Sequence, residues 1–223
     1  EVAAMLPKAG GALTGAVTTN STIDGRDVAA DGVLATNALP KAGGTMTGNI
    51  ATKGITSVTL GTSNFVAGVN AGNSITSGGI YNTVVGDEAG TAITTGTRNT
   101  AVGYGSLDAT TTGDKNTSIG GSALTNNTTG ENNTGLGFSA LQLNTTGTRN
   151  IAVGYDSLRS NTTGANNTSL GTSSLFTNTT GQKNTALGQG ALYSSTTASD
   201  NTAIGNDALF ANTTGTNNVA TGM

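Results

Sequence analysis

Two kinds of side chain that bind sugars recur in this chain at multiples of 17 residues. Four of the nine basic residues share this spacing: Arg98, Lys115, Arg149 and Lys183. Six of the eight aromatic residues fall into two such sets, which are Tyr104, Phe138 and Tyr155, and then Phe176, Tyr193 and Phe210. Basic side chains bind anionic groups and aromatic rings bind sugar faces, so Arg98, Lys115, Arg149, Lys183, Phe176, Tyr193 and Phe210 are candidate contacts for an anionic glycan. A solvated turn and structural ring stacking are the favoured interpretations of the two patterns.

The residues for catalysis or metal binding are sparse. The chain has no His and no Cys, which removes the commonest general base, the commonest transition-metal ligand and all thiol chemistry. Asp87 and Glu88 are adjacent, so in a strand they point to opposite faces. Asp24, Asp27 and Asp31 cluster but lack the alternating spacing of a calcium loop. We therefore expect no enzyme activity, no metal site and no cofactor.

Composition limits the classes of partner. Twelve acidic and nine basic residues give a net charge of −3, which does not favour nucleic acid as a partner. No apolar run approaches the roughly 20 residues of a membrane span, so we expect no membrane segment. Thr, Asn and Gly suit stacked turns and short strands, whereas a disordered chain is usually more charged.

From Asn82 onward the sequence repeats every 17 residues without insertion or deletion. The consensus is N-T-A-(V/I/L)-G-x-x-(A/S)-L-x-x-N-T-T-G-x-x, with eight complete copies and a ninth that begins at Asn218. We number the positions of the repeat from this first Asn, and we call the residues that share a position a column. Such a strict period indicates a repeat fold. The basic residues above belong to column seventeen, and the aromatic residues to columns six and ten.

Each column suggests a structural role. Position four is aliphatic in all eight complete copies and position nine is Leu in seven, with Gly90 as the exception, so we predict that both columns face the core. Position eight is always Ala or Ser, which suits a crowded site. The invariant Gly at position five predicts a corner with positive φ or a close backbone approach. The T-T-G at positions thirteen to fifteen indicates a turn or return strand, and Ala198 is the only substitution at its Gly.

Seventeen residues are too few for a helical repeat but enough for a coil of two short strands and two turns. If coils stack about 4.8 Å apart, identical residues lie above one another and the Asn and Thr columns form hydrogen-bonded ladders. We therefore predict an all-β, fibrous parallel β-solenoid of 17-residue coils. Two large apolar side chains per coil make a thin core, so we expect parallel chains to share apolar columns in a homotrimer.

The sequence predicts three segments. Residues 82–223 form the solenoid, and residues 49–81 form degenerate capping coils, because N-F-V-A-G at 64–68 resembles a repeat start. Residues 1–48 hold another repeat, in which L-P-K-A-G-G-A-L-T-G at 6–15 returns 33 residues later as L-P-K-A-G-G-T-M-T-G. The Pro and Gly content predicts a thin, irregular fibre segment there.

These motifs resemble those of fibre proteins. L-P-K-A-G-G-T-M-T-G is similar to a short repeat in the tail fibres of many bacteriophages, and I-D-G-R-D at 23–27 is similar to stretches of marine phage fibres. The N-T-A-(V/I)-G repeat resembles that of fibre proteins that often end in a self-cleaving chaperone domain. It is also similar to the head repeats of trimeric autotransporter adhesins, which form left-handed parallel β-rolls. The resemblance implies a trimeric fibre that carries host-recognition modules.

We therefore expect a structural and adhesive segment of a phage tail fibre, located on the virion tail, that projects host-binding elements. Its expected partners are two further copies of itself, other tail or baseplate proteins, and a host glycan or lipopolysaccharide. The first alternative is the head of a trimeric autotransporter adhesin, against which the paired L-P-K-A-G-G motifs speak. The second is a monomeric ice-binding solenoid, because Thr columns present regular hydroxyl groups.

Overall fold

The computed structural model describes residues 22–23, 26–27 and 63–222. The chain divides into two units, Glu1–Asn49 and Ile50–Met223. In the first unit, β1 (Thr22–Ile23) pairs antiparallel with β2 (Arg26–Asp27). The rest of the predicted fibre segment 1–48, and residues 49–62 of the predicted capping coils, lie outside the described residues. Among the described residues there is no helix that is long and apolar enough to cross a membrane.

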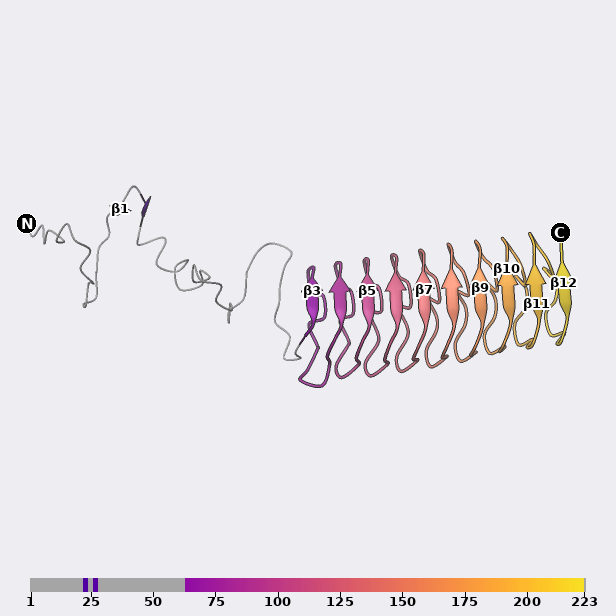
Figure 1. The fold of residues 1–223 in the computed structure, drawn as a ribbon, viewed down its shortest axis with the longest axis horizontal. Coiled ribbons are helices and arrows are strands. Elements are labelled where there is room, and N and C mark those ends of the chain that lie inside the picture. Colours follow the sequence, from indigo (N-terminus) through magenta and orange to yellow (C-terminus); the bar gives the residue numbers. More distant parts are fainter. Residues whose placement is uncertain (1–21, 24–25, 28–62, 223) are drawn as a thin grey trace, which may run out of the picture. The chain divides into compact units, whose positions relative to one another are not determined.

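The second unit contains a parallel β-solenoid, as predicted (Figure 1). One three-residue strand per coil joins a ten-stranded sheet whose neighbours follow one another in chain order. The strands are β3 (Phe65–Ala67), β4 (Thr83–Val85), β5 (Thr100–Val102), β6 (Thr117–Ile119), β7 (Thr134–Leu136), β8 (Ile151–Val153), β9 (Thr168–Leu170), β10 (Thr185–Leu187), β11 (Thr202–Ile204) and β12 (Val219–Thr221). From β4 onward each residue pairs with the residue 17 positions later, as in Thr168↔Thr185.

The second strand that we predicted for each coil is absent from the described residues. Only positions two to four form a strand, and the remainder of each coil consists of turns, bends and irregular segments. Positions seven and nine adopt left-handed backbone conformations, as at Asp156 (φ 53°) and Leu158 (φ 50°), and these break up an extended strand. Backbone hydrogen bonds still join this part of each coil to the next, for example from the Leu141 N–H to the Ser157 carbonyl oxygen at 3.0 Å.

The core is narrow and is lined by columns three and nine. The prediction for column nine is confirmed, since Leu107, Leu124, Leu141, Leu158, Leu175 and Leu192 are fully buried. The prediction for column four is wrong. Side chains alternate along a strand, and it is position three that points inward, as at Ala152 and Ala186. Because Leu from column nine fills the space opposite, column three accepts small residues, and the larger aliphatic side chain at position four points outward.

The exception at Gly90 has a packing explanation. In its coil, position twelve is Ile93, and a Cβ added at Gly90 would lie 2.8 Å from the Ile93 Cδ1 atom. The preceding coil repeats this arrangement with Gly72 and Ile75. Ile at position twelve therefore occupies the volume that Leu at position nine occupies in later coils.

The corner glycines of column five behave as predicted. Gly103 has a φ of 126°, and a Cβ added there would lie 2.8 Å from the carbonyl oxygen of Gly120 in the next coil. Both the backbone conformation and the close approach of successive coils therefore require Gly.

The Asn residues of column one form the predicted ladder. Asn133 is fully buried, and its Nδ2 donates to the carbonyl oxygen of Gly147 at 2.8 Å. Its Oδ1 accepts from the Asn150 backbone N–H at 3.0 Å and from the Asn150 Nδ2 at 3.2 Å. Each such Asn thus closes its own coil and binds the next one, which satisfies buried backbone groups that no strand pairs.

A second buried amide ladder runs along column twelve. Asn144 Nδ2 donates to the carbonyl oxygen of Gly147 at 3.0 Å, the same oxygen that accepts from Asn133. It also donates to Asn127 Oδ1 in the preceding coil at 2.8 Å. Beside it, Thr145 Oγ1 donates to the carbonyl oxygen of Thr162 at 3.0 Å, and this contact recurs along column thirteen. The N-T-T-G element is therefore a turn held by its own Asn, with Thr side chains that join the coils.

The column-twelve ladder is interrupted in the coil 184–200. Position twelve is Ser195 and position fifteen is Ala198, and within the described residues the buried Asn178 Oδ1 and Ser195 Oγ atoms have no hydrogen-bond partner. A Cβ added at Gly181 would collide with Asn178 Oδ1 of its own coil. A side chain at position fifteen thus excludes Asn from position twelve, and Ser195 and Ala198 are a coupled pair.

Removal of one column-one amide should destabilise the solenoid. Asn133→Ala leaves the buried Asn150 N–H without its acceptor and removes a donor from Gly147, so we expect a loss of about 2–4 kcal/mol in the free energy of unfolding. Chemical denaturation followed by circular dichroism measures this loss. The control is Asn126→Ala, whose side chain is exposed. Equal stability of the two variants would contradict the ladder's role.

The coupled pair predicts a non-additive double-mutant cycle. Ser195→Asn alone should destabilise the chain, because the new amide oxygen meets the Ala198 Cβ. The double variant Ser195→Asn/Ala198→Gly supplies the donor that Asn178 Oδ1 lacks, so the coupling free energy should favour it by about 1–3 kcal/mol. Denaturation of the four proteins gives this value, and additive effects would show that the two sites are independent.

Candidate interaction surfaces

The outward side chains of the sheet form an exposed, uncharged surface. We call it the strand face, and it consists of columns two and four on β3–β12. Column two is mostly Thr, and column four is aliphatic from Val85 to Ile204. Leu136, Leu170, Leu187 and Ile204 of column four each keep about two fifths of their surface exposed: 41%, 42%, 40% and 40%. The apolar column that we had expected in the core therefore lies on the outside of the chain.

Aromatic residues of column six lie next to the strand face, just past the corner glycine. Tyr104, Phe138 and Tyr155 are all more than half exposed. Phe138 and Tyr155 stack on each other with ring centroids 5.6 Å apart. The hydroxyl group of Tyr104 hydrogen-bonds to Glu88, and this bond raises the pKa of Tyr104 above its ordinary value. Column six thus extends the apolar surface of columns two and four.

The aromatic residues of column ten stack on one another along the solenoid axis. The Phe176 and Tyr193 ring centroids are 5.1 Å apart, and those of Tyr193 and Phe210 are 4.9 Å apart, with nearly parallel planes. The guanidinium of Arg159 lies over the other face of Phe176, 5.7 Å from its centroid. Sugars stack on ring faces, and neighbouring side chains occupy these faces, so the arrangement favours the structural interpretation of this column.

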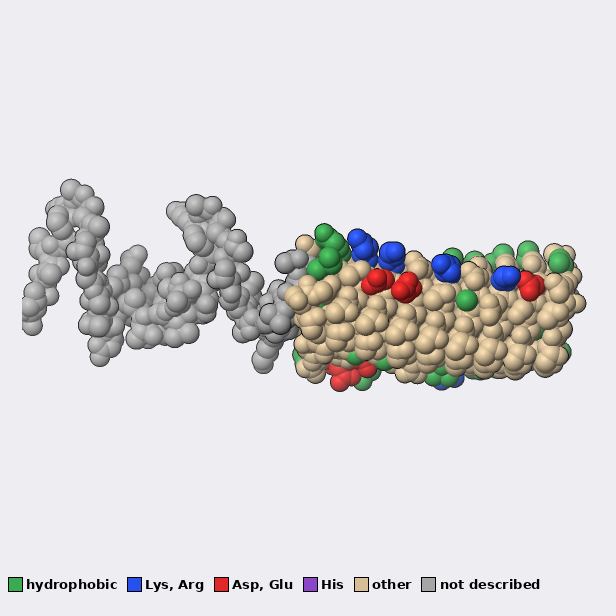
Figure 2. All heavy atoms as spheres, turned by 90° about the horizontal axis from the view of Figure 1, so that it is seen from below, with side chains coloured by type: hydrophobic (Ala, Val, Ile, Leu, Met, Phe, Trp, Pro, Cys, Tyr) green, Lys and Arg blue, Asp and Glu red, His purple; other side chains and the backbone are tan. Residues whose placement is uncertain are grey.

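The basic residues of column seventeen lie in a row along one edge of the solenoid (Figure 2). Arg98, Lys115, Arg149 and Lys183 are all exposed. Acidic residues lie close by, and Lys183 Nζ is 4.0 Å from Asp200 Oδ1. Arg98 lies over the Tyr81 ring, 5.6 Å from its centroid. The predicted basic column therefore exists as a row of exposed side chains that Asn132 and Asn166 interrupt, and part of its charge is neutralised.

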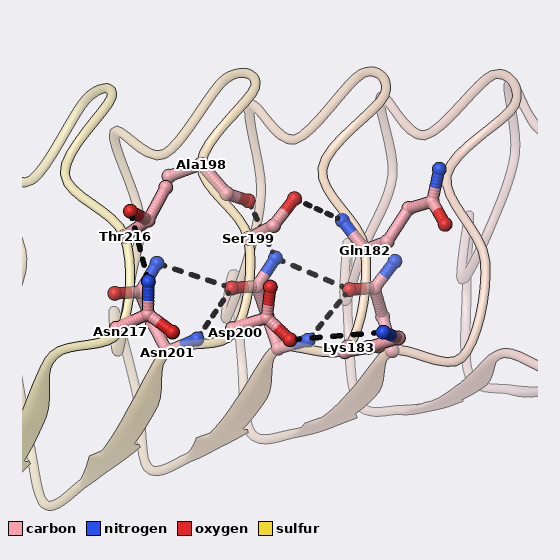
Figure 3. A network of polar contacts seen from close by, with 10 residues as sticks. Gln182, Lys183, Ala198, Ser199, Asp200, Asn201, Thr216 and Asn217 are labelled. Carbon is pink, nitrogen blue, oxygen red and sulfur yellow. Dashed lines mark hydrogen bonds and ion pairs between the residues drawn. The ribbon is translucent and has the colours of Figure 1, made fainter.

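Column sixteen contributes contacts that the sequence did not indicate. Figure 3 shows Ser199, whose Oγ accepts a hydrogen bond from the Gln182 backbone N–H at 3.0 Å. Asp114 does the same for Thr97, at 2.6 Å. Position sixteen varies between coils, so no pattern in the sequence singled it out. Its polar side chains satisfy backbone groups at the same edge as column seventeen.

The described residues contain no group of His, Cys, Asp and Glu side chains suited to hold a metal ion. Asp87 and Glu88 are not part of a strand, and both lie exposed in the turn that follows β4. The side chains of Asp24, Asp27 and Asp31 lie outside the described residues.

The chain matches no known protein family, no curated protein and no solved structure.

Loss of a central stacked ring should lower stability. Tyr193 lies between Phe176 and Phe210, so Tyr193→Ala removes two ring contacts, and we expect a loss of about 1–3 kcal/mol in the free energy of unfolding. Chemical denaturation measures this value. Tyr104→Ala is the control, because the Tyr104 side chain is 60% exposed. If Tyr193→Ala unfolded no more easily than Tyr104→Ala, the column would not be structural.

Proposed function

We propose that the chain is a structural and adhesive segment of a phage tail fibre, a rigid shaft that acts as a parallel homotrimer and projects host-binding elements. The observation that carries this proposal is the strand face, an uncharged surface of columns two and four that runs the length of the sheet. The paired L-P-K-A-G-G motifs at 6–15 and 39–48 support a fibre of the phage type rather than the head of an autotransporter adhesin.

The strand face supports self-association for a physical reason. Exposed contiguous apolar surface is unusual in a monomer and marks an interaction site. The core of each chain holds small residues in column three, whereas the larger aliphatic residues of column four face outward. Three parallel chains with their strand faces turned toward a common axis bury column four in a shared core. Burial stabilises such an assembly by about 25 cal/mol for each Å² of apolar surface removed from water.

A trimer also suits an adhesive role on a virion. Three copies held in register present each weak contact three times, and linked contacts raise overall binding by avidity. The partners in this proposal are two further copies of the chain, neighbouring tail or baseplate proteins, and a glycan or lipopolysaccharide on the host surface. The shaft itself performs no catalysis.

A monomeric ice-binding solenoid is the second candidate, and the strand face also favours it. Column two presents Thr on seven of the ten strands, beside the aliphatic side chains of column four. A flat array of regularly spaced hydroxyl and methyl groups, free of charge, is what contact with an ordered water lattice requires. This candidate uses the strand face of a single chain, so it and the trimer exclude each other.

The solution mass of the purified chain, measured by sedimentation equilibrium, tests the proposal. We expect three times the mass of one chain. The variant Leu170→Glu/Leu187→Glu places two charges in column four and should yield folded monomers. Each Leu is about 40% exposed in the single chain, so the fold tolerates the change. In the trimer, the same carboxylates would be buried at the axis without partners, which opposes assembly.

The matched control is Thr163→Glu/Thr180→Glu in column fourteen, whose side chains are exposed and outside the strand face. It should remain trimeric. A column-four variant that stays trimeric would overturn the assignment of the interface. A wild-type chain that is a folded monomer would overturn the trimer, and thermal hysteresis of that monomer would then support ice binding.

A further inference from the structure

Four of the five basic residues of the solenoid lie in column seventeen, and they make few contacts within the chain. Lys183 has one ion pair at the 4.0 Å limit, and Arg98 rests on Tyr81. Lys115 and Arg149 form no ion pair with other described residues. Exposed charges of this kind add little to stability. Their recurrence in a single column therefore calls for a role outside the fold.

The backbone conformation of column seventeen strengthens this argument. Arg98, Lys115, Arg149 and Lys183 all have φ between 55° and 59°, in the left-handed region. Asn tolerates that conformation better than Lys or Arg does, and Asn occupies the same position in three other coils. The buried Leu of column nine offsets similar strain through packing, whereas column seventeen is held by backbone hydrogen bonds to the preceding coil, such as that from the Arg149 N–H to the Glu131 carbonyl oxygen at 3.0 Å. Coil closure explains the backbone conformation but not the choice of Lys or Arg over Asn, and this choice points to a functional site.

The order of residues along column seventeen sets the distance between its cationic groups. Lys115, Arg149 and Lys183 occupy every second coil, and the exposed Asn132 and Asn166 stand between them. With coils about 4.8 Å apart, the cationic groups recur about every 10 Å. A sugar unit in an extended polysaccharide advances by about the rise of one coil. The cations therefore match an anionic group on every second sugar, and the Asn amides face the sugars between.

Acidic residues limit the part of column seventeen that can bind an anion. Asp114 is engaged by the Thr97 N–H and hydroxyl group, and Asp200 follows Lys183 at the end of the basic run. Glu131 is exposed beside Asn132 and opposes an anion bound there. From position 115 to position 183, column seventeen itself therefore holds three basic residues and no acidic residue, and Asp114 and Glu131 lie beside it in column sixteen.

We propose that column seventeen binds an acidic polysaccharide lengthwise, one that carries a carboxylate on every second sugar. Lys115, Arg149 and Lys183 pair with successive carboxylates, and Asn132 and Asn166 hydrogen-bond to the hydroxyl groups of the intervening sugars. This inference deepens the adhesive part of the proposed function. All the contacts lie within one chain, so binding does not require the trimer.

The test uses a variant that the repeat itself suggests. Lys115→Asn/Arg149→Asn/Lys183→Asn places at each site the residue found at the same position in other coils, so the fold should persist. The probe is hyaluronan, in which glucuronate alternates with a neutral amino sugar, and polygalacturonate and dextran are compared with it. We expect the wild-type chain to bind hyaluronan and the triple variant to bind it roughly tenfold more weakly, with both affinities falling as salt is added.

Two controls distinguish specific contacts between column seventeen and the carboxylates from a general effect of net charge. Thr112→Glu/Thr146→Glu/Thr180→Glu lowers the net charge by the same three units in column fourteen and should bind nearly as well as the wild type. Glu131→Gln removes the opposing carboxylate and should bind more tightly.

Equal weakening of the two triple variants, tighter binding of polygalacturonate than of hyaluronan, or no binding by the wild-type chain would overturn the inference. Sedimentation of the same samples keeps the two proposals apart. If the chain is a trimer that does not bind hyaluronan, only the proposed polysaccharide site is refuted. If it is a monomer that binds hyaluronan, only the proposed trimer is refuted.

Discussion

The buried amides of column one are the interaction on which the rest of the solenoid depends. Each Asn closes its own coil through a position-fifteen carbonyl oxygen and accepts the backbone N–H of the next Asn, as Asn133 does with Gly147 and Asn150. Both contacts exist only if consecutive Asn residues lie directly above one another. The coil that begins at Asn64 is one residue longer than the later ones, and Asn64 Oδ1 still accepts the Asn82 backbone N–H at 2.7 Å, so this contact holds the coils in register.

The same stacking restricts the other columns. Glycines such as Gly103 have no room for a Cβ because the next coil approaches so closely. The amides of columns one and twelve and the Leu of column nine then fill a narrow interior, so column three is small in every coil that has this Leu. Where one column changes, another changes with it: Ile93 fills the space left at Gly90, and Ser195 replaces Asn where Ala198 occupies position fifteen. The interior therefore has little space left for large apolar side chains, and these are placed on the strand face.

Stacking also gives every surface column an axial repeat, and this property decides what each column can bind. In column ten the repeat brings the rings of Phe176, Tyr193 and Phe210 face to face, and they bind each other. In column seventeen the repeat spaces the charged groups along a line. Their mutual repulsion is too weak to disturb the fold, and their side chains face solvent. The strand face combines an axial repeat with apolar side chains, which suits another surface of the same period. A second copy of the chain has that period.

The sequence by itself determined the period, the parallel stacking, the Asn and Thr ladders, the inward Leu column and the glycine corners, because strict repetition places like residues in contact. It did not indicate correctly which way column four faces. The large side chain of Val85 or Leu136 suggested burial, whereas alternation along the strand from the Asn at position one, which the structure buries, places position three inside. Only the tertiary structure decided this, because the space opposite column three is taken by Leu and Asn from distant turns. It likewise decided that position twelve is buried and that the return segment forms turns, since left-handed residues such as Leu158 are imposed by coil closure and not by local preference.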